Sequence, residues 1–512
     1  MASFWQTENR RLCAASSASP VGSFNSLTVV GSYTQAAGST YQVKVAGTGQ
    51  SDSLSVFGLT GATATLQGGT VGIVVAPGPF PRPRTYTILS AADGITGKFA
   101  GITSSAVALQ ATLSYDATHA FVTLSAANFE AGAQTPGQDA VAKTLNGADD
   151  TASGDFATVI GALSVLGSTQ ASQALQQIGG QQYAGFATAG VQSAQLFMSN
   201  FAQQAGGGSS GGGSHIALAE ACDVACDATS SRWGAWGGAL AGFGTVAGDV
   251  ANPGITYSMG GFSAGLDYRV QDGLLVGVAA GYSGSTLYTQ GLAGTGTSDS
   301  LQIGLYASLN LGDGYLDGLA GYAHGTNRMT RMIAIPGLDL RTARGETAFN
   351  QMFGHLEAGY RLDLAGPARA FVTPFVRMQG STTLQDGFTE SGADSLNLVV
   401  APQTTNSLRS VLGAQLGGSL DTGWRGPLNL TLRLGWSHEY LDLSRPVTAA
   451  FAGAPALGFT TQGAAAPRDG TVIGLMASTA VAESTSAYFR YDGEIAGNNS
   501  GHLLSAGVRF VW

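Results

Sequence analysis

Apolar and polar residues alternate with a period of two over residues 232–512, which is the most regular pattern in the chain. In the last run, Leu504 and Phe510 share one face, opposite Ser505 and Arg509. About twelve such runs occur, near residues 232–243, 255–270, 273–285, 298–311, 314–329, 343–363, 370–384, 404–421, 427–442, 470–482, 485–496 and 501–512. Each contains at least the roughly ten tilted residues that cross a bilayer. The pattern predicts a 12-stranded antiparallel transmembrane β-barrel.

The polar face of these runs favours a membrane barrel over a soluble β-sandwich. A sandwich exposes a face rich in Lys and Glu, whereas the polar positions here are mainly Gly, Ser, Gln and Asn. Small inward residues would leave room for an occupant inside the barrel. Short connections such as residues 271–273 alternate with long ones such as 445–469, as expected of periplasmic turns and outer loops. Aromatic residues near the predicted strand ends suit the membrane interfaces; these are Tyr288, Trp436, Tyr440 and Trp512.

The N-terminal part of the chain carries a different β pattern. Short runs of β-branched and aromatic residues stand between Gly and Pro residues, as at 26–30, 40–45, 85–89 and 119–124. Such runs suit the coils of a β-solenoid or a small sandwich. We predict an unstructured start at residues 1–20 and a β-solenoid-like segment at residues 21–130.

The stretch between these two parts is uncharged. No Asp, Glu, Lys or Arg occurs in residues 156–219, and the pattern in residues 170–204 predicts a helix. Residues 206–214 form a Gly/Ser-rich linker. The segment 131–231 is either an ordinary interdomain helix and tether or a slim neutral element that lies inside a pore, and the stretch alone does not decide between them.

Composition excludes several classes of protein. Only 11% of the residues are charged and the net charge is −9, so no basic surface for nucleic acid is expected. With 44% hydrophobic residues, global disorder is a poor interpretation. No run of some twenty apolar residues occurs, which leaves a closed barrel as the expected way to cross a membrane. The first twenty residues lack the order of a signal peptide, and we interpret the chain as a truncated piece of a longer exported precursor.

Candidate chemistry is sparse, and we predict no enzyme, cofactor or metal site. Residues 261–265, Gly-Phe-Ser-Ala-Gly, match the nucleophile-elbow motif, but they continue one alternating strand, so Ser263 should face the lumen. The six histidines show no metal-ligand spacing. Cys222 and Cys226 lie close enough to form a small disulfide loop, although two free thiols are the alternative. Lumenal ion pairs are expected among Arg377, Arg409, Arg433, Arg509, Glu357, Glu439 and Asp267.

Several motifs of the C-terminal part resemble the translocator domain of bacterial autotransporters. They are Arg-Trp-Gly-Ala-Trp at 232–236, residues 260–269 and 276–282, Thr-Pro-Phe at 373–375, residues 388–393 and 409–414, and the closing Gly-Val-Arg-Phe-Val-Trp at 507–512. Residues 31–124 also resemble the last β-helical coils of an autotransporter passenger. In this order the motifs are specific, although each one alone is weak.

The resemblance implies type V secretion. The barrel would lie in the outer membrane and export its passenger to the cell surface, leaving a helix near residues 183–204 in the lumen. Phe510 and Trp512 in the terminal strand would form the signal read by the outer-membrane assembly machinery. Periplasmic chaperones and outer-membrane lipid are the other expected partners of a monomeric barrel. A surface adhesin, or a hydrolase lost by truncation, remains open for the passenger, and Asn200 alone does not mark a cleavage site.

Overall fold

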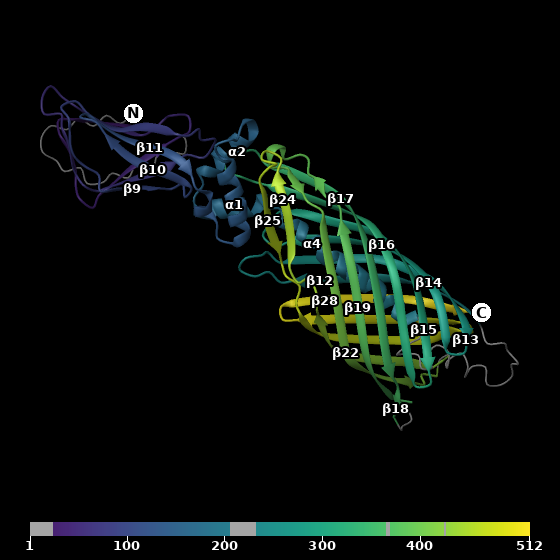
Figure 1. Ribbon diagram of the computed structural model, residues 1–512. Coiled ribbons are helices and arrows are strands. Elements are labelled where there is room, and N and C mark those ends of the chain that lie inside the picture. The colour runs from purple at the N-terminus through teal and green to yellow at the C-terminus, as the bar shows by residue number, and fades with distance from the viewer. Residues whose placement is uncertain (1–23, 205–231, 365–368, 424–425) are drawn as a thin grey trace.

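The computed structural model describes residues 24–204, 232–364, 369–423 and 426–512. An N-terminal β domain and a C-terminal barrel lie at opposite ends of an elongated molecule, with helices between them (Figure 1). The predicted unstructured start, residues 1–20, lies outside the described residues.

The N-terminal domain is a three-sided parallel β-solenoid. Its sides are β1 (Ser26–Val30), β4 (Ser53–Phe57) and β7 (Arg84–Ala91); β2 (Tyr33–Gln35), β5 (Ala64–Gln67) and β8 (Ile95–Lys98); and β3 (Thr40–Val45), β6 (Thr70–Val75) and β9 (Gly101–Ser104). Equivalent residues stack between coils, and Val43 faces Ile73 in the buried core. The antiparallel hairpin of β10 (Leu109–Tyr115) and β11 (His119–Ala127) continues the first side beyond β7. Of the two predicted alternatives, the chain therefore forms the solenoid.

Helices follow the solenoid. They are η1 (Phe129–Gly132), α1 (Pro136–Ala148), α2 (Gly154–Ser164), α3 (Ser168–Ile178), η2 (Gln181–Tyr183) and α4 (Ala184–Gln204). The single helix predicted over residues 170–204 is broken, because Gly180 adopts a left-handed conformation with φ +69°. This break redirects the chain from α3, outside the barrel, into α4. No helix among the described residues is both long and apolar enough to cross a membrane.

The C-terminal part closes into a barrel of twelve antiparallel strands, as predicted. They are β12 (Trp233–Val246), β13 (Ile255–Gln271), β14 (Leu274–Thr289), β15 (Gly294–Leu311), β16 (Gly314–Ile333), β17 (Arg341–Tyr360), β19 (Phe371–Gln385), β22 (Gln403–Leu420), β23 (Leu428–Glu439), β26 (Asp469–Ala482), β27 (Thr485–Ala496) and β28 (Asn499–Val511). The short β18 (Leu362–Asp363) follows β17 and pairs with β19. Pairing of β12 with β28 completes the ring.

The two ends of the barrel differ in their connections. The backbones of Trp233 and Trp512 exchange hydrogen bonds of 3.1 and 3.0 Å, so the first and last strands start and finish together. Turns at 271–274, 311–314 and 482–485 lie at this end, which we call the turn end. Longer connections, including those that carry the additional strands, lie at the opposite loop end.

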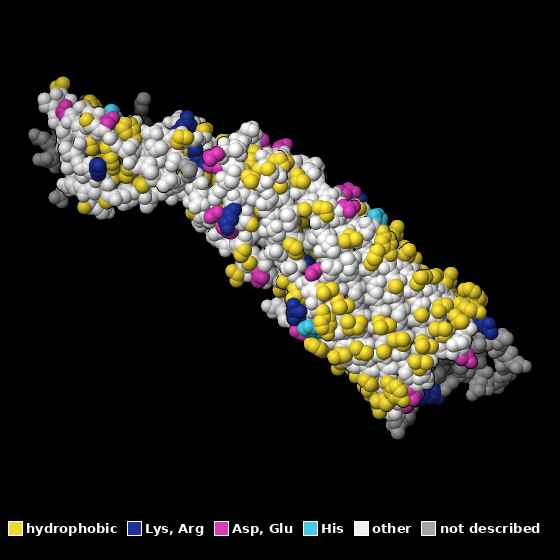
Figure 2. Space-filling model, in the orientation of Figure 1, with side chains coloured by type: hydrophobic (Ala, Val, Ile, Leu, Met, Phe, Trp, Pro, Cys, Tyr) yellow, Lys and Arg dark blue, Asp and Glu magenta, His cyan; other side chains and the backbone are white. Residues whose placement is uncertain are grey.

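The predicted division of faces holds along the wall. Leu301, Ile303 and Leu305 in β15 are 59–67% exposed on the outside, whereas Gln302 between them is 2% exposed. On the face that Figure 2 shows, hydrophobic side chains form rows over the part of the barrel toward the turn end. Since exposed apolar patches of this extent are unusual in soluble proteins, this surface suits the hydrocarbon of a membrane.

Inside the barrel, aromatic rings lie over glycines of neighbouring strands. The indole of Trp236 in β12 covers Gly265 in β13, where an added Cβ would lie 2.6 Å from the indole atoms. Tyr306 in β15 covers Gly277 in β14 in the same way. These glycines are required by close approach, because any side chain would displace a ring that fills the lumen.

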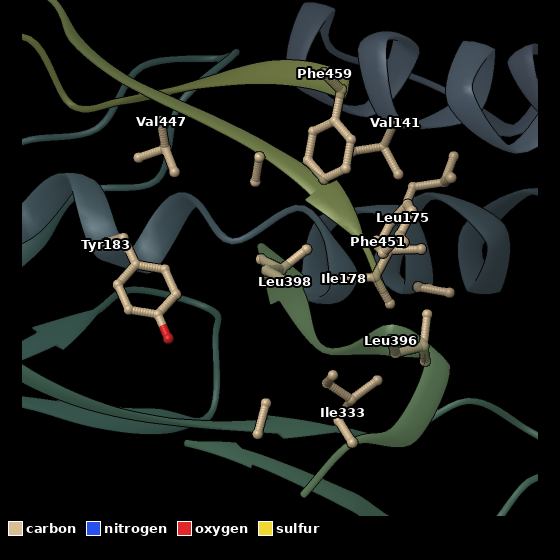
Figure 3. Close-up of a cluster of buried hydrophobic side chains, with 14 of the residues drawn as sticks. Val141, Leu175, Ile178, Tyr183, Ile333, Leu396, Leu398, Val447, Phe451 and Phe459 are labelled. Carbon is tan, nitrogen blue, oxygen red and sulfur yellow. The ribbon is translucent and has the colours of Figure 1, made fainter. Parts of the chain in front are cut away.

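A second sheet stands on the loop end. It consists of β20 (Phe388–Thr389), β21 (Leu398–Val400), β24 (Arg445–Phe451) and β25 (Gly458–Gly463), and η3 (Asp394–Leu396) precedes β21. The sequence predicted only a long loop at 445–469. Val141 and Leu175 from the helices pack on Phe451 and Leu396 in one hydrophobic core (Figure 3). Neither the sheet nor the helices bury their apolar faces without the other.

The Gly265–Trp236 contact gives a testable consequence. Gly265→Ala should lower the free energy of unfolding of the barrel by about 1–3 kcal/mol, because the ring must leave its place. Gly237→Ala on the paired strand is the control, since its Cβ would meet its nearest neighbours at 3.8 Å. The midpoint of the heat-induced mobility shift of unboiled samples in SDS gels measures the difference. Equal midpoints for both variants would contradict the packing argument.

Candidate functional site

The lumen is occupied by α4, a helix without a single charged residue. Polar side chains of the wall bond to it from several sides. The Gln351 amide donates to the backbone oxygen of Gly190 at 3.0 Å, and the Gln302 amide donates to the Ser193 hydroxyl at 2.8 Å. The predicted helix in the lumen is therefore confirmed, and it is held by packing as well, since Phe197 of α4 lies against Phe353 of the wall with ring centroids 5.5 Å apart.

Asn200 fixes the helix near its C-terminal end. Its amide nitrogen donates to the Ser263 hydroxyl at 2.6 Å, and its amide oxygen accepts from the Tyr488 hydroxyl at 3.0 Å. Arg490 donates to the backbone oxygen of Ser199 at 3.2 Å. A cation at this position also opposes the negative end of the helix dipole. The helix therefore has a defined register in the barrel.

A small cavity remains beside the N-terminal half of α4. It has a volume of about 10 Å³ and lies between Ala187 and Gly190 of α4 and the strand wall. Asn327, Gln385 and Gln403 are among the polar side chains that line it. A gap of this size has room for about one water molecule, so the helix nearly fills this part of the lumen.

Paired charges line the lumen toward the turn end, as expected. Arg377 donates to Glu357 at 2.6 Å, and Arg433 also binds this carboxylate. Arg509 pairs with Asp267 at 2.6 Å. Glu357 and Arg377 are direct partners on the adjacent strands β17 and β19, and Asp267 and Arg509 lie on β13 and β28, on either side of β12, so these pairs tie neighbouring parts of the wall together.

The two other predicted lumenal charges have different partners. Arg409 pairs with Glu494 at 2.9 Å. Glu439 accepts from the Ser407 hydroxyl at 2.6 Å and from the backbone nitrogen of Leu408 at 2.8 Å. Sequence reasoning also missed Arg331, Glu390 and Tyr183, which meet at the loop end. Arg331 occupies an inward-facing position in the alternating pattern of β16, and this pattern could have predicted that its side chain points into the lumen.

The remaining candidate residues do not form a reactive centre among the residues that the structure describes. Ser263 lies in the middle of β13 and bonds to Asn200, without the strand-to-helix turn of a nucleophile elbow. His119 belongs to the solenoid, His355 is buried in the lumen, and His324, His438 and His502 lie on the outer wall. No group of three or more possible metal ligands occurs in the described ranges.

The structure describes the residues of the predicted assembly signal but not those of the predicted disulfide. Cys222, Cys226 and His215 lie outside the described residues. Phe510 and Trp512 lie at the end of the chain on the outer face of the barrel, 44% and 51% exposed, with ring centroids 5.4 Å apart. They are accessible from the lipid side.

An ion pair docks the helices on the loop end. Asp155 in α2 accepts two bonds of 2.7 Å from the Arg341 guanidinium and one of 3.1 Å from the backbone nitrogen of Ser395. Arg341 above all, and the Ser395 donors in addition, hold the pKa of the Asp155 carboxyl below its usual value. The carboxylate form is therefore the one that holds α2 in place.

The fold and the lumen define a class, a transmembrane β-barrel filled by a helix of its own chain. A family model described as Autotransporter beta-domain matches residues 235–492, which is half of the chain. Two Serratia marcescens proteins named "Extracellular serine protease" are each 24% identical to this chain over 526 residues, covering 92% of this chain and 47% of the relative. The chain thus spans about half the length of these relatives.

Solved structures with related folds include translocator domains. The translocator domain of autotransporter NalP from Neisseria meningitidis covers 65% of this chain and 99% of its own, with 17% identity and a TM-score of 0.47. The beta domain of the Bordetella autotransporter BrkA covers 55% of this chain and 99% of its own, with 18% identity and a TM-score of 0.40.

On the family match, this chain belongs to the autotransporters. Its barrel is an outer-membrane translocator that exports a passenger to the cell surface. The barrel itself is not catalytic. The loop end accordingly faces the cell exterior and the turn end faces the periplasm.

The Asp155–Arg341 pair predicts a pH dependence of helix docking. Because the folded pKa of Asp155 is lowered, the pair stabilises the docked helices above the unfolded pKa of about 3.9 and loses this effect as the pH falls toward the folded pKa. Asp155→Asn should cost about 1 kcal/mol or less near neutral pH. Guanidinium titrations of both proteins at several pH values measure the difference, which should shrink below about pH 4. A difference that stays constant with pH would contradict this account.

Proposed function

We propose that the chain is arranged as it is after export, with α4 left in the lumen as the tether of the exported part. One observation carries this proposal. The chain leaves the lumen at the loop end through η2 and continues into the helices and the solenoid, all on the exterior side. The solenoid and the helices are thus fixed to the outer membrane through α4 and the barrel.

The proposed organisation has four parts. They are a start at residues 1–20, a passenger end at 21–130, a helical segment with its linker at 131–231, and the barrel at 232–512. A disulfide between Cys222 and Cys226 would close only a very small loop, which is compatible with a narrow lumen. Mass spectrometry of the unreduced protein tests it, and free thiols at both positions would exclude the disulfide.

For the passenger we propose a serine protease activity, because that is the name of the Serratia marcescens relatives. A passenger that acts as an adhesin is the alternative. The gene sequence upstream of Met1 distinguishes the two. An in-frame continuation with the Ser, His and Asp motifs of a protease supports the first, and a continuation with coil repeats alone would exclude it.

For assembly we propose the outer-membrane barrel assembly machinery and periplasmic chaperones as partners of a barrel that inserts as a monomer. The support is the pair Phe510 and Trp512, whose rings are exposed beside the closing pair of strands. An assembly factor in the membrane can reach these aromatic side chains before β12 and β28 pair and close the barrel.

The export function predicts surface exposure of the N-terminal part. The full chain is expressed behind a cleavable export signal, with an epitope tag before Ser26. Antibody should bind the tag on intact cells, while a periplasmic marker stays inaccessible. Detection only after permeabilisation of the cells would contradict export.

A double variant tests the assembly proposal in the same cells. With Phe510→Ser and Trp512→Ser combined, heat-modifiable barrel and surface tag should both fall severalfold, because the outer face loses the two rings. Unchanged amounts of folded barrel would exclude these residues as the assembly signal while leaving export itself intact.

A further inference from the structure

A fully buried ion pair lies at the loop end of the lumen. Arg331 near the end of β16 and Glu390 after β20 have side chains with 0% exposure. The Arg331 Nε and one terminal nitrogen donate to the two Glu390 oxygens at 2.6 and 2.7 Å. The backbone nitrogen of Leu398 adds a bond of 2.8 Å to the carboxylate. Burial of two charges is costly unless all their polar atoms are satisfied.

The remaining partners of this pair come from residues 177–183, the last residues of α3 and the η2 turn that leads into α4. The other terminal nitrogen of Arg331 donates to the backbone oxygen of Gln177 at 2.8 Å. The Tyr183 hydroxyl donates to Glu390 at 2.6 Å. Removal of this segment would leave both buried charges short of a partner. The pair is therefore complete only with this segment in place.

Further bonds fix the same segment in one register. The Gln181 amide donates to the backbone oxygen of Gln462 at 3.0 Å, and the Gln182 amide donates to that of Ala293 at 3.0 Å. These acceptors lie in two different connections of the loop end. A shift of the segment by a single residue would misplace all of these donors together.

We propose that Gln177, Tyr183, Arg331 and Glu390 form a latch that locks the exported segment to the barrel. The inference rests on the export function proposed above. In the exported arrangement, Gln177 and Tyr183 lie against the connection between β19 and β22, which carries Glu390. The buried pair closes on them in one register. The latch holds α4 in the lumen and keeps its outer end shut.

The buried carboxylate of Glu357 serves as a comparison for that of Glu390. Glu357 is also buried and binds Arg377 and Arg433, but all three side chains belong to barrel strands. The Tyr315 hydroxyl that donates to it at 2.8 Å belongs to the barrel as well. Loss of Glu357 should therefore weaken the wall, whereas loss of Glu390 should release the exported segment.

The test measures how often the outer end of α4 opens. Ala187, 6% exposed and one turn beyond Tyr183, is replaced by Cys in the exported, tagged chain, whose native Cys13, Cys222 and Cys226 are changed to Ser. A membrane-impermeant maleimide is added to intact cells and the labelling rate is recorded. Slow labelling is expected in this parent, because access requires local opening.

Glu390→Gln should raise the labelling rate about 100-fold or more, because Arg331 is left without its counter-charge. Tyr183→Phe, which removes one hydroxyl and disturbs folding least, should raise it roughly tenfold. Glu357→Gln should lower the heat resistance of the barrel without a matching rise in labelling. If Glu390→Gln does not reach the membrane, Tyr183→Phe decides.

Two outcomes separate the latch from the export function. If the surface tag is present but Tyr183→Phe and Glu390→Gln label at the parent rate, the latch is wrong and export stands. If Glu357→Gln accelerates labelling as much as Glu390→Gln, the effect is general destabilisation and the latch is also wrong. If the tag of the parent never reaches the surface, the export function itself is wrong.

Discussion

The need to satisfy every backbone hydrogen bond within the hydrocarbon layer governs this structure. No water is available there to pair with an open strand edge, so β12 and β28, at the two ends of the barrel sequence, must meet. Their continuous pairing from Gly234 with Val511 to Thr245 with Ser500 closes the ring. Closure of twelve strands then fixes a lumen wide enough for one helix among small residues.

That lumen imposes its own rules on side chains. A charge inside it must find a partner on a nearby part of the wall, as Glu357 does with Arg377 on the adjacent strand and Asp267 does with Arg509 on the far side of β12. The segment that remains in the lumen must be slim and neutral, and α4 carries no charge at all. Polar wall residues such as Gln351 and Ser263 then position it by single hydrogen bonds, each of modest strength.

At the exterior end, the barrel and the exported chain become one folding unit. The strands β21, β24 and β25 present an apolar face that α1 and α3 cover, and Phe451 is completely buried between them. The helices and this sheet therefore share one hydrophobic core at the loop end.

The sequence by itself determined the number of strands, the lipid and lumen faces and the neutral character of the lumenal segment. Each is a local property, since a strand with one face toward lipid must alternate residue by residue. It did not reveal the break at Gly180, the second sheet on the loop end or the partners of Arg331. Glu390 lies 59 residues from Arg331 and 207 from Tyr183, so no local spacing relates them. Only the tertiary structure, which folds the β19–β22 connection and the returning helix onto the end of β16, brought these groups together.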